Sequence, residues 1–127
     1  GLSSAVDQLL SNHRINDLQI DFEENLEDMR LPIDLEVLLF RLVQEGLNNI
    51  VKHAAASEVL IRLKKEHGFI ELCIRDNGRG FDVTKISNSS FGISSMKSRV
   101  KDAAGTLQIN AQINNGTQIN VRIPLKE

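Results

Sequence analysis

Two polar clusters interrupt otherwise apolar segments of this 127-residue chain. The first is Glu45, Asn48, Asn49 and Lys52, within a segment of helical periodicity; the second is the sequence Asp76–Phe81, directly after an apolar strand pattern. Carboxylate and amide oxygens suit a hard cation such as Mg²⁺. Closely spaced glycines let a backbone approach a flat ligand. Together the clusters predict the metal end and the base end of one nucleotide site.

The first cluster lies on a helix that we predict from Asp34 to about Ala55, where Gly46 is the only glycine and no proline intervenes. Apolar and polar residues gather on opposite sides of this helix. A polar stripe is most often a solvated face, but two adjacent asparagines are poor helix formers that a solvated face does not require. The apolar stripe comprises Leu39, Phe40, Val43, Leu47, Ile50, Val51 and Ala54, and the polar one Arg41, Glu45, Asn49 and Lys52.

The side chains of this stripe match the chemistry of a metal-bound phosphate. The neutral amide oxygen of Asn49 is a suitable Mg²⁺ ligand. Glu45, one turn earlier, can orient or deprotonate a nucleophile or hold a metal-bound water. Lys52, one turn later, can meet a phosphate as a point charge.

The second cluster admits two interpretations. Asn77-Gly78 between apolar runs is typical of a β-hairpin, but the following residues 81–90 are polar and end in a serine-rich stretch, so no second strand begins. We therefore predict a ligand-binding loop, in which Gly78 and Gly80 admit a flat ligand and Asp76 accepts a hydrogen bond from an exocyclic amine. A P-loop is excluded because the chain has no Gly-Lys-Ser/Thr triplet, and a dinucleotide fingerprint would need a third glycine and a following helix that are lacking here.

A further helix is predicted to open around Gly92, to run to about Ala104 and to be closed by Gly105. Its first backbone N–H groups could bind an anion. The alternative is that Gly92 is only a turn and Ser94 only an N-cap.

We expect an α/β sandwich in which a mixed, mainly antiparallel five-stranded sheet carries helices on one face. Alternating patterns predict the strands, and Asn114-Asn115-Gly116 predicts the turn of the last hairpin. The remaining expected elements are a helix near Leu2 to Leu10 and strands near Asp17 to Glu23, Glu58 to Lys65, Phe69 to Arg75, Thr106 to Ala111 and Thr117 to Ile123.

The composition indicates one soluble domain over residues 1–127. A net charge of −2 without a basic run argues against nucleic-acid binding. No apolar run approaches the length of a membrane span. The single cysteine, Cys73, lies in an apolar strand pattern, so we expect it to be buried and neither a ligand nor a nucleophile.

Four motifs, in this order, resemble those of the ATP-binding catalytic domain of bacterial sensor histidine kinases, within the GHKL (Bergerat) ATPase superfamily. The first motif, the N box at Gln44–Ala54, has the form typical of the subfamily that contains nitrate sensors and a membrane-fluidity thermosensor. Ser95 stands where that subfamily often has glycine, Ser98 where it often has an acid, and Ile50 where alanine is frequent. The motifs are Gln44–Ala54 (N box), Asp76–Phe81 (G1 box), Phe91–Val100 (G2 region) and Gly116-Thr117 with the strand that follows.

The resemblance implies that ATP and Mg²⁺ bind here. Asn49 would ligate Mg²⁺, Glu45 would lie beside the metal and the γ-phosphate, and Asp76 would accept from the adenine amine. Residues 82–90 would form the ATP lid. Gly78 and Gly80 would line the base pocket, Thr117 would support the adenine, Lys52 and His53 would lie toward the phosphates, and Asn48, Phe81, Gly92, Ile93 and Met96 would complete the nucleotide site.

The resemblance also implies partners. Kinases of this family phosphorylate a histidine, followed by an acidic residue, on a separate dimerisation domain. None of His13, His53 and His67 has that context. We therefore expect a monomeric, excised catalytic domain that cannot autophosphorylate alone and that reaches a response regulator through the full-length kinase. It would be the cytoplasmic part of that kinase, for which an integral membrane sensor is one arrangement.

Three alternatives to the sensor kinase remain open. A stand-alone GHKL serine kinase that binds a sigma factor would need no histidine domain. A degenerate interaction module would bind no nucleotide, although intact Asn49, Asp76, Gly78 and Gly80 argue against it. A gyrase-like or chaperone ATPase would need a longer lid and a second domain. The Lys52-His53-Ala54 ending of the N box favours the sensor kinase.

Overall fold

A computed structural model of the chain describes residues 2–13, 18–26, 30–80 and 92–125. The predicted ATP lid, residues 82–90, and Phe81 of the predicted nucleotide site lie outside the described residues.

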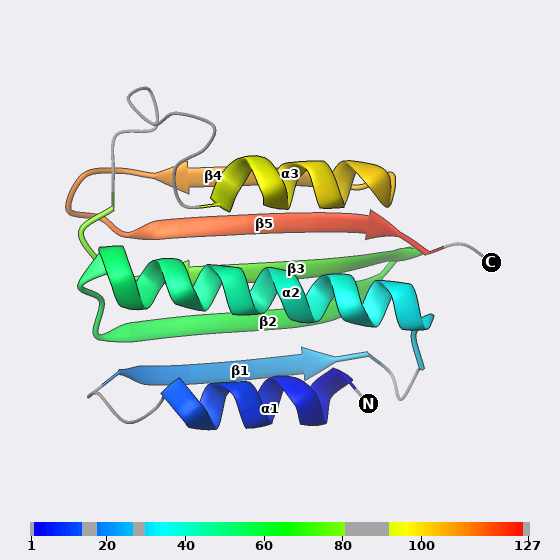
Figure 1. The fold of residues 1–127 in the computed structure, drawn as a ribbon, viewed down its shortest axis with the longest axis horizontal. Coiled ribbons are helices and arrows are strands. Elements are labelled where there is room, and N and C mark those ends of the chain that lie inside the picture. Colours follow the sequence, from blue (N-terminus) through cyan, green and yellow to red (C-terminus); the bar gives the residue numbers. More distant parts are fainter. Residues whose placement is uncertain (1, 14–17, 27–29, 81–91, 126–127) are drawn as a thin grey trace.

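The described strands form one five-stranded sheet in the order β1-β2-β3-β5-β4 (Figure 1). Strand β1 is parallel to β2, and the other three neighbouring pairs are antiparallel. The prediction of a mixed, mainly antiparallel sheet is therefore confirmed. The strands are β1 (Gln19–Asn25), β2 (Glu58–Glu66), β3 (Phe69–Asp76), β4 (Thr106–Ala111) and β5 (Thr117–Pro124).

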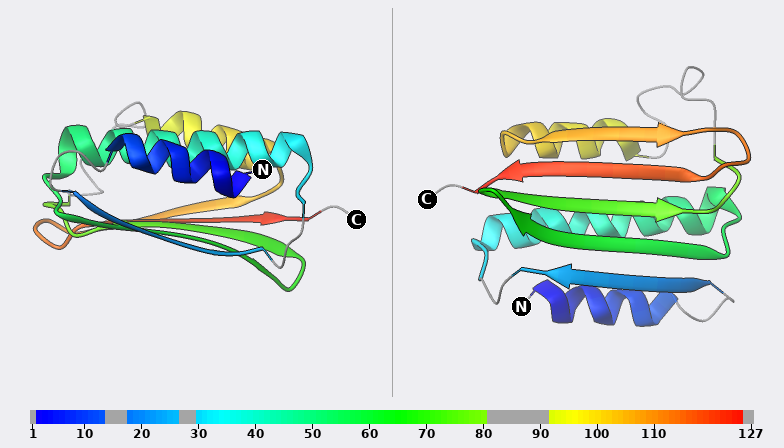
Figure 2. Two further views of the ribbon diagram at one scale, coloured as in Figure 1. Left: turned by 90° about the horizontal axis from the view of Figure 1, so that it is seen from below. Right: turned by 180° about the vertical axis from the view of Figure 1, so that it is seen from behind.

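All described helices cover the same face of this sheet, as the edge-on view in Figure 2 shows. None of them is long and apolar enough to cross a membrane. Helix α2 continues directly into a π-helical turn, η1, so the long predicted helix is present with a change of pitch near its end. The helices are α1 (Leu2–His13), α2 (Ile33–Asn49), η1 (Ile50–Ala54) and α3 (Ile93–Asp102).

The hydrophobic core lies between the helices and the sheet. Val59, Ile61 and Leu63 alternate along β2 toward the helices and are almost fully buried, as one buried sheet face requires. Helix α2 contributes a buried stripe that includes Leu42, which the predicted stripe lacked. Val51, predicted in that stripe, is 52% exposed. It lies at the margin of the stripe, where helical periodicity turns it away from the sheet.

Helix α3 begins one residue after the predicted opening at Gly92 and ends at Asp102, two residues before the predicted end at Ala104. Its N-cap is Gly92, with φ +66°, and it begins at Ile93, so Ser94 is not the N-cap. At its other end Ala104, with φ +61°, adopts the left-handed conformation expected of Gly105. The backbone N–H of Gly105 bonds to Val100 O and that of Ala104 to Lys101 O. This is a Schellman motif with alanine in the position that favours glycine.

Cys73 is half-buried on the open face of the sheet, so the prediction that it would be buried is wrong. Its neighbours Leu72 and Ile74 point into the core, and alternation along β3 turns Cys73 to the other side. Burial raises the pKa of its thiol.

Candidate nucleotide-binding site

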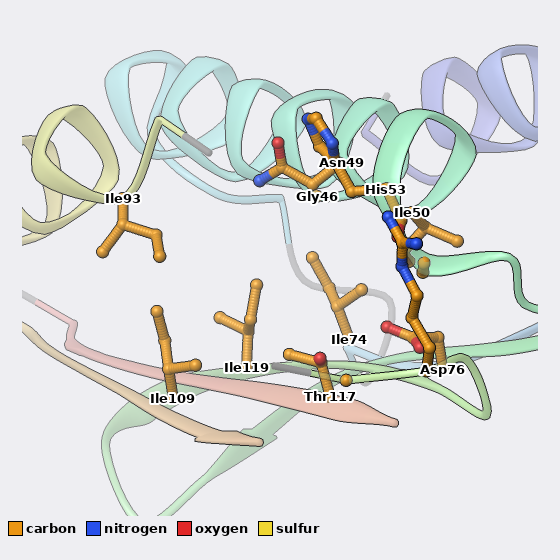
Figure 3. A pocket seen from close by; sticks show the side chains of 13 residues that line it. Gly46, Asn49, Ile50, His53, Ile74, Asp76, Ile93, Ile109, Thr117 and Ile119 are labelled. Atoms are coloured by element: carbon orange, nitrogen blue, oxygen red, sulfur yellow. The ribbon is translucent and has the colours of Figure 1, made fainter. Parts of the chain in front are cut away.

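A cavity of about 280 Å³ lies between the end of the long helix and the adjoining ends of β3, β4 and β5. Figure 3 shows Asn49 and His53 on its helical side and Asp76 and Thr117 on its sheet side. The cavity therefore brings Asn49 of the first polar cluster together with Asp76 and Gly80 of the second. It is lined by Gly46, Asn49, Ile50, His53, Ala54, Ile74, Asp76, Arg79, Gly80, Ile93, Ile109, Thr117 and Ile119.

Asp76, the last residue of β3, forms the polar end of the cavity and is 7% exposed. Its Oδ1 accepts a hydrogen bond from the Gly78 backbone N–H at 2.8 Å. Burial raises the pKa of the Asp76 carboxyl, while hydrogen bonds from the backbone amides of Gly78 and Thr117 oppose the rise. Thr117 lies opposite Asp76 in the β3–β5 register. A buried acceptor in apolar surroundings strongly favours a ligand that donates a hydrogen bond to it.

Isoleucine side chains form most of the apolar wall around this carboxylate (Figure 3). They come from the π-turn, three strands and the start of α3, and so close around the same space from several directions. Such walls suit the faces of a flat heterocycle. Of this set the sequence had suggested only Ile93 for the site, because the others belong to ordinary strand and helix patterns. The five are Ile50, Ile74, Ile93, Ile109 and Ile119.

The loop after β3 is held by close backbone packing. A Cβ on Gly78 would meet Ala54 O and would lie 2.8 Å from Asp76 Oδ1. Gly80 has φ +61°, and a Cβ there would meet Gln112 O. Both glycines are therefore required by neighbouring protein atoms. Gly80 also lines the cavity, whereas Gly78 does not.

Asn77 fastens this loop to the start of β2. Its Oδ1 accepts hydrogen bonds from the backbone N–H groups of Ser57 and Glu58, both at 2.9 Å, and its Nδ2 donates to Ser57 Oγ at 3.0 Å. These bonds explain why the Asn77-Gly78 pair does not form a hairpin turn. Nothing local in the sequence indicates a partner some twenty residues away.

The helical side of the cavity depends on a close approach of α2 to the sheet. Gly46 is buried, and a Cβ there would lie 2.8 Å from the Ile74 Cδ1 atom. This approach brings Asn49, the last residue of α2, to the cavity wall. A glycine inside an otherwise regular helix pattern is the sequence signal for such packing.

Glu45 lies against the start of α3 and not in the cavity wall. A Cβ on Gly92 would meet the Glu45 carboxylate, so the two residues are in direct contact. Met96 is buried in the core at 2% exposure, and Lys52 is exposed. Of the described residues proposed from the sequence, those outside the cavity wall are Glu45, Asn48, Lys52, Gly78, Gly92 and Met96, and those in it are Asn49, His53, Asp76, Gly80, Ile93 and Thr117.

Within the described residues, no group of three or more His, Cys, Asp or Glu side chains could hold a metal ion. The cavity instead offers the amide oxygen of Asn49. Mg²⁺ commonly keeps several waters and takes one or two protein ligands beside substrate phosphates. The residues present therefore fit a Mg²⁺ ion that arrives with a phosphate-bearing ligand.

The described fold, a mixed sheet with helices on one face, is similar to the folds of solved histidine kinase catalytic domains. The blue-light activated histidine kinase of Erythrobacter litoralis EL346 superposes with a TM-score of 0.81 at 19% identity, covering 98% of this chain and 40% of that one. The catalytic domain of histidine kinase ThkA superposes with a TM-score of 0.76 at 14% identity, covering 97% of this chain and 88% of that one. These likenesses establish the fold.

Sequence comparison identifies the family. The family described as histidine kinase-, DNA gyrase B-, and HSP90-like ATPase matches residues 34–127, and the chain belongs to it. DegS of Brevibacillus brevis, a signal transduction histidine-protein kinase/phosphatase, is 42% identical over 106 residues, which are 84% of this chain and 28% of DegS. The sensor histidine kinase LiaS of Bacillus subtilis is 34% identical over 125 residues, 98% of this chain and 34% of LiaS. The chain thus corresponds to the ATPase catalytic domain of such kinases and spans about a third of their length.

Proposed function

We propose that this domain binds ATP with Mg²⁺ and donates the γ-phosphoryl group to a histidine on a separate dimerisation domain of the same kinase. The observation that carries the proposal is the placement of the buried Asp76 carboxylate and the Asn49 amide in the wall of one apolar cavity. One end of the cavity suits a purine amine, and the other suits metal-bound phosphates.

At the base end, Asp76 accepts a hydrogen bond from the exocyclic amine of adenine. The carboxylate is already oriented by the N–H of Gly78, so little reorganisation accompanies binding. The isoleucine walls contact the faces of the ring. Thr117, opposite Asp76 in the sheet, supports the same edge of the base.

At the phosphate end, Asn49 supplies a protein ligand to Mg²⁺, and His53 lies beside it in the cavity wall. Lys52 is exposed on the same helical turn and can approach the phosphates from solvent. Bound Mg²⁺ would offset the charge that develops on the phosphate oxygens. Asn48, Phe81, Gly92 and Met96 remain predicted members of the nucleotide site.

In the transfer step, an imidazole nitrogen of the acceptor histidine forms a bond to the γ-phosphorus while the bond from that phosphorus to the bridging oxygen breaks, and ADP leaves. The catalytic domain positions the phosphates for this displacement. Glu45, held against Gly92, orients the incoming imidazole or accepts its proton. No histidine of the chain is followed by an acidic residue, so we expect no autophosphorylation of this chain by itself.

The first experiment is calorimetric titration of the domain with ATP and Mg²⁺ beside an Asp76→Ala variant. Binding that the variant loses supports the assignment of the base end. Absence of heat from the unmodified domain would favour an interaction module that binds no nucleotide.

The second experiment supplies labelled ATP together with a histidine-bearing dimerisation domain. Acid-labile label on that domain supports histidine transfer, and label on a protein serine would favour the serine kinase alternative. Loss of transfer in Glu45→Gln with ATP binding retained supports the role of Glu45; unchanged transfer would remove it.

The similarity to the sensor histidine kinase LiaS supports a wider proposal about the full-length protein. We propose that the full-length kinase, whether or not membrane-anchored, passes the phosphoryl group to a response regulator, and that this cytoplasmic domain is monomeric alone. Light scattering of the domain tests the last point.

A further inference from the structure

Arg79, in the loop after β3, makes two hydrogen bonds to the end of the long helix. Its Nε donates to His53 O at 2.6 Å, and its backbone N–H donates to Ala54 O at 2.7 Å. The last carbonyls of a helix have no partners within the helix, and they carry its negative pole. A guanidinium group therefore stabilises this helix end through both charge and hydrogen bonding.

The same residue is also tied to the β4–β5 hairpin. The Arg79 carbonyl accepts a hydrogen bond from the Asn114 backbone N–H at 2.5 Å. Arg79 thus connects the π-turn η1, the loop after β3 and the hairpin loop, which are far apart in the sequence. It also lines the cavity between them.

The cavity residues on either side of this connection belong to different segments. Asn49 and His53 belong to the long helix and its π-turn, whereas Asp76 and Gly80 belong to β3 and its loop. A ligand that reaches from Asp76 to Asn49 requires a definite separation between these segments, and small displacements of binding groups weaken such a ligand strongly.

We propose that Arg79 is a positioning residue that sets the separation between the base end and the phosphate end of the nucleotide site. The proposal rests on the ATP-binding function proposed above. It concerns the Arg79 side chain, because the two backbone bonds of Arg79 remain in any substitution other than proline. Loss of the guanidinium leaves the bond from the Arg79 backbone N–H to Ala54 O in place and removes the bond to His53 O, which weakens the hold of the loop on this helix end.

The test compares adenosine with Mg²⁺-ATP by calorimetry in Arg79→Ala, Arg79→Lys and the unmodified domain. We expect Arg79→Ala to weaken ATP roughly tenfold, as loss of a charge-assisted hydrogen bond does, and to change adenosine affinity less than twofold. Lysine, which keeps a cationic donor, restores part of the loss. Arg62→Ala is the matched control, because Arg62 is an exposed arginine on the open sheet face, paired with Glu23.

A second readout separates positioning from direct contact with the phosphates. Hydrogen exchange at the amides of residues 50–55, measured without nucleotide, is expected to accelerate in Arg79→Ala and not in Arg62→Ala. Unchanged exchange together with weakened ATP binding would show a direct contact and overturn the proposal. Equal weakening of adenosine and ATP would show general disruption and also overturn it.

The outcomes keep this inference distinct from the proposed function. If the unmodified domain binds neither adenosine nor ATP, the proposed function fails at once. If it binds both and Arg79→Ala binds both unchanged, only the role of Arg79 fails. Should Arg79→Ala not fold, as judged by circular dichroism, Arg79→Lys supplies the same comparison of adenosine with ATP.

Discussion

Gly46 of α2 faces Ile74 of β3 at such close range that a Cβ on the glycine would lie 2.8 Å from the Ile74 Cδ1 atom. Glycine inside a helix is less favourable than alanine by about 1 kcal/mol. The contact explains why glycine occupies this position, since it lets the helix approach the sheet beside the cavity that both residues line.

Gly46→Ala is therefore expected to lower both the melting temperature and ATP affinity, although alanine is the better helix former. The added methyl group must push α2 away from β3 or force Ile74 into the cavity. Thermal unfolding and ATP titration measure the two effects. Ile74→Val, which removes the Cδ1 atom, should restore much of both losses in the double variant. A Gly46→Ala protein more stable than the unmodified one would contradict this packing.

The buried carboxylate of Asp76 should contribute less stability to the ligand-free domain at neutral pH than at acidic pH. Burial raises its pKa in the folded state, so the folded form binds the proton more readily than the unfolded chain does. The stabilisation is fully present below the usual aspartate pKa of about 3.9 and is lost as the pH rises through the higher folded-state pKa.

Asp76→Asn, which carries no charge, should thus unfold at a higher temperature than the unmodified domain at pH 7, with the difference vanishing at acidic pH. The same variant should bind ATP at least tenfold more weakly, since a charged acceptor is lost. Paired melting curves from pH 3 to pH 7 measure the first effect, and titration measures the second. If the Asp76→Asn domain were less stable than the unmodified domain at pH 7, the hydrogen bonds from the backbone amides of Gly78 and Thr117 would stabilise the charged carboxylate by more than its desolvation costs.

The contact between Gly92 and Glu45 predicts a difference between two otherwise similar glycines. Gly92 and Gly68 both have positive φ, +66° and +80°, but nothing lies within 4 Å of a Cβ on Gly68. Alanine at either position should cost about 1 kcal/mol of backbone strain. Only Gly92→Ala should also displace the Glu45 carboxylate and reduce phosphoryl transfer to a supplied histidine domain. Equal transfer rates in the two variants would mean that the carboxylate position does not matter.

Most of the fold could be predicted because each strand pattern agrees with the pairing it adopts. Val59, Ile61 and Leu63 alternate in the sequence and all face the core. The differences arise where tertiary contacts decide. Strand β1 runs from Gln19 to Asn25 because its parallel pairing with β2 sets its limits. Ala104 takes the left-handed position because Gly105 is closely packed: a Cβ on Gly105 would lie 2.6 Å from Arg122 O.

The candidate site was predictable where chemistry follows local spacing. Asn49, Asp76 and Gly80 belong to short motifs and meet at one cavity. The residues that hold these motifs together were not predictable, because their partners are remote in the sequence. Asn77 bonds to Ser57, and Arg79 bonds to His53. No local periodicity in the sequence indicates such pairs. The isoleucines of the cavity wall follow the same strand and helix patterns as core residues, so the sequence does not distinguish them from the core.

Asn49→Ala should separate metal-dependent from metal-independent binding. Its amide oxygen is the proposed protein ligand to Mg²⁺, so the variant should lose most of the affinity that Mg²⁺ adds to ATP and should keep its affinity for adenosine, which carries no phosphate. Titrations with ATP in Mg²⁺ and in a chelator, and with adenosine, measure the three quantities. Asn25→Ala, at the exposed end of β1, is the matched control. Because the apolar walls and Asp76 are unaltered, a parallel loss of adenosine binding would point to damaged packing of α2, and an undiminished Mg²⁺ effect would place the metal ligand elsewhere.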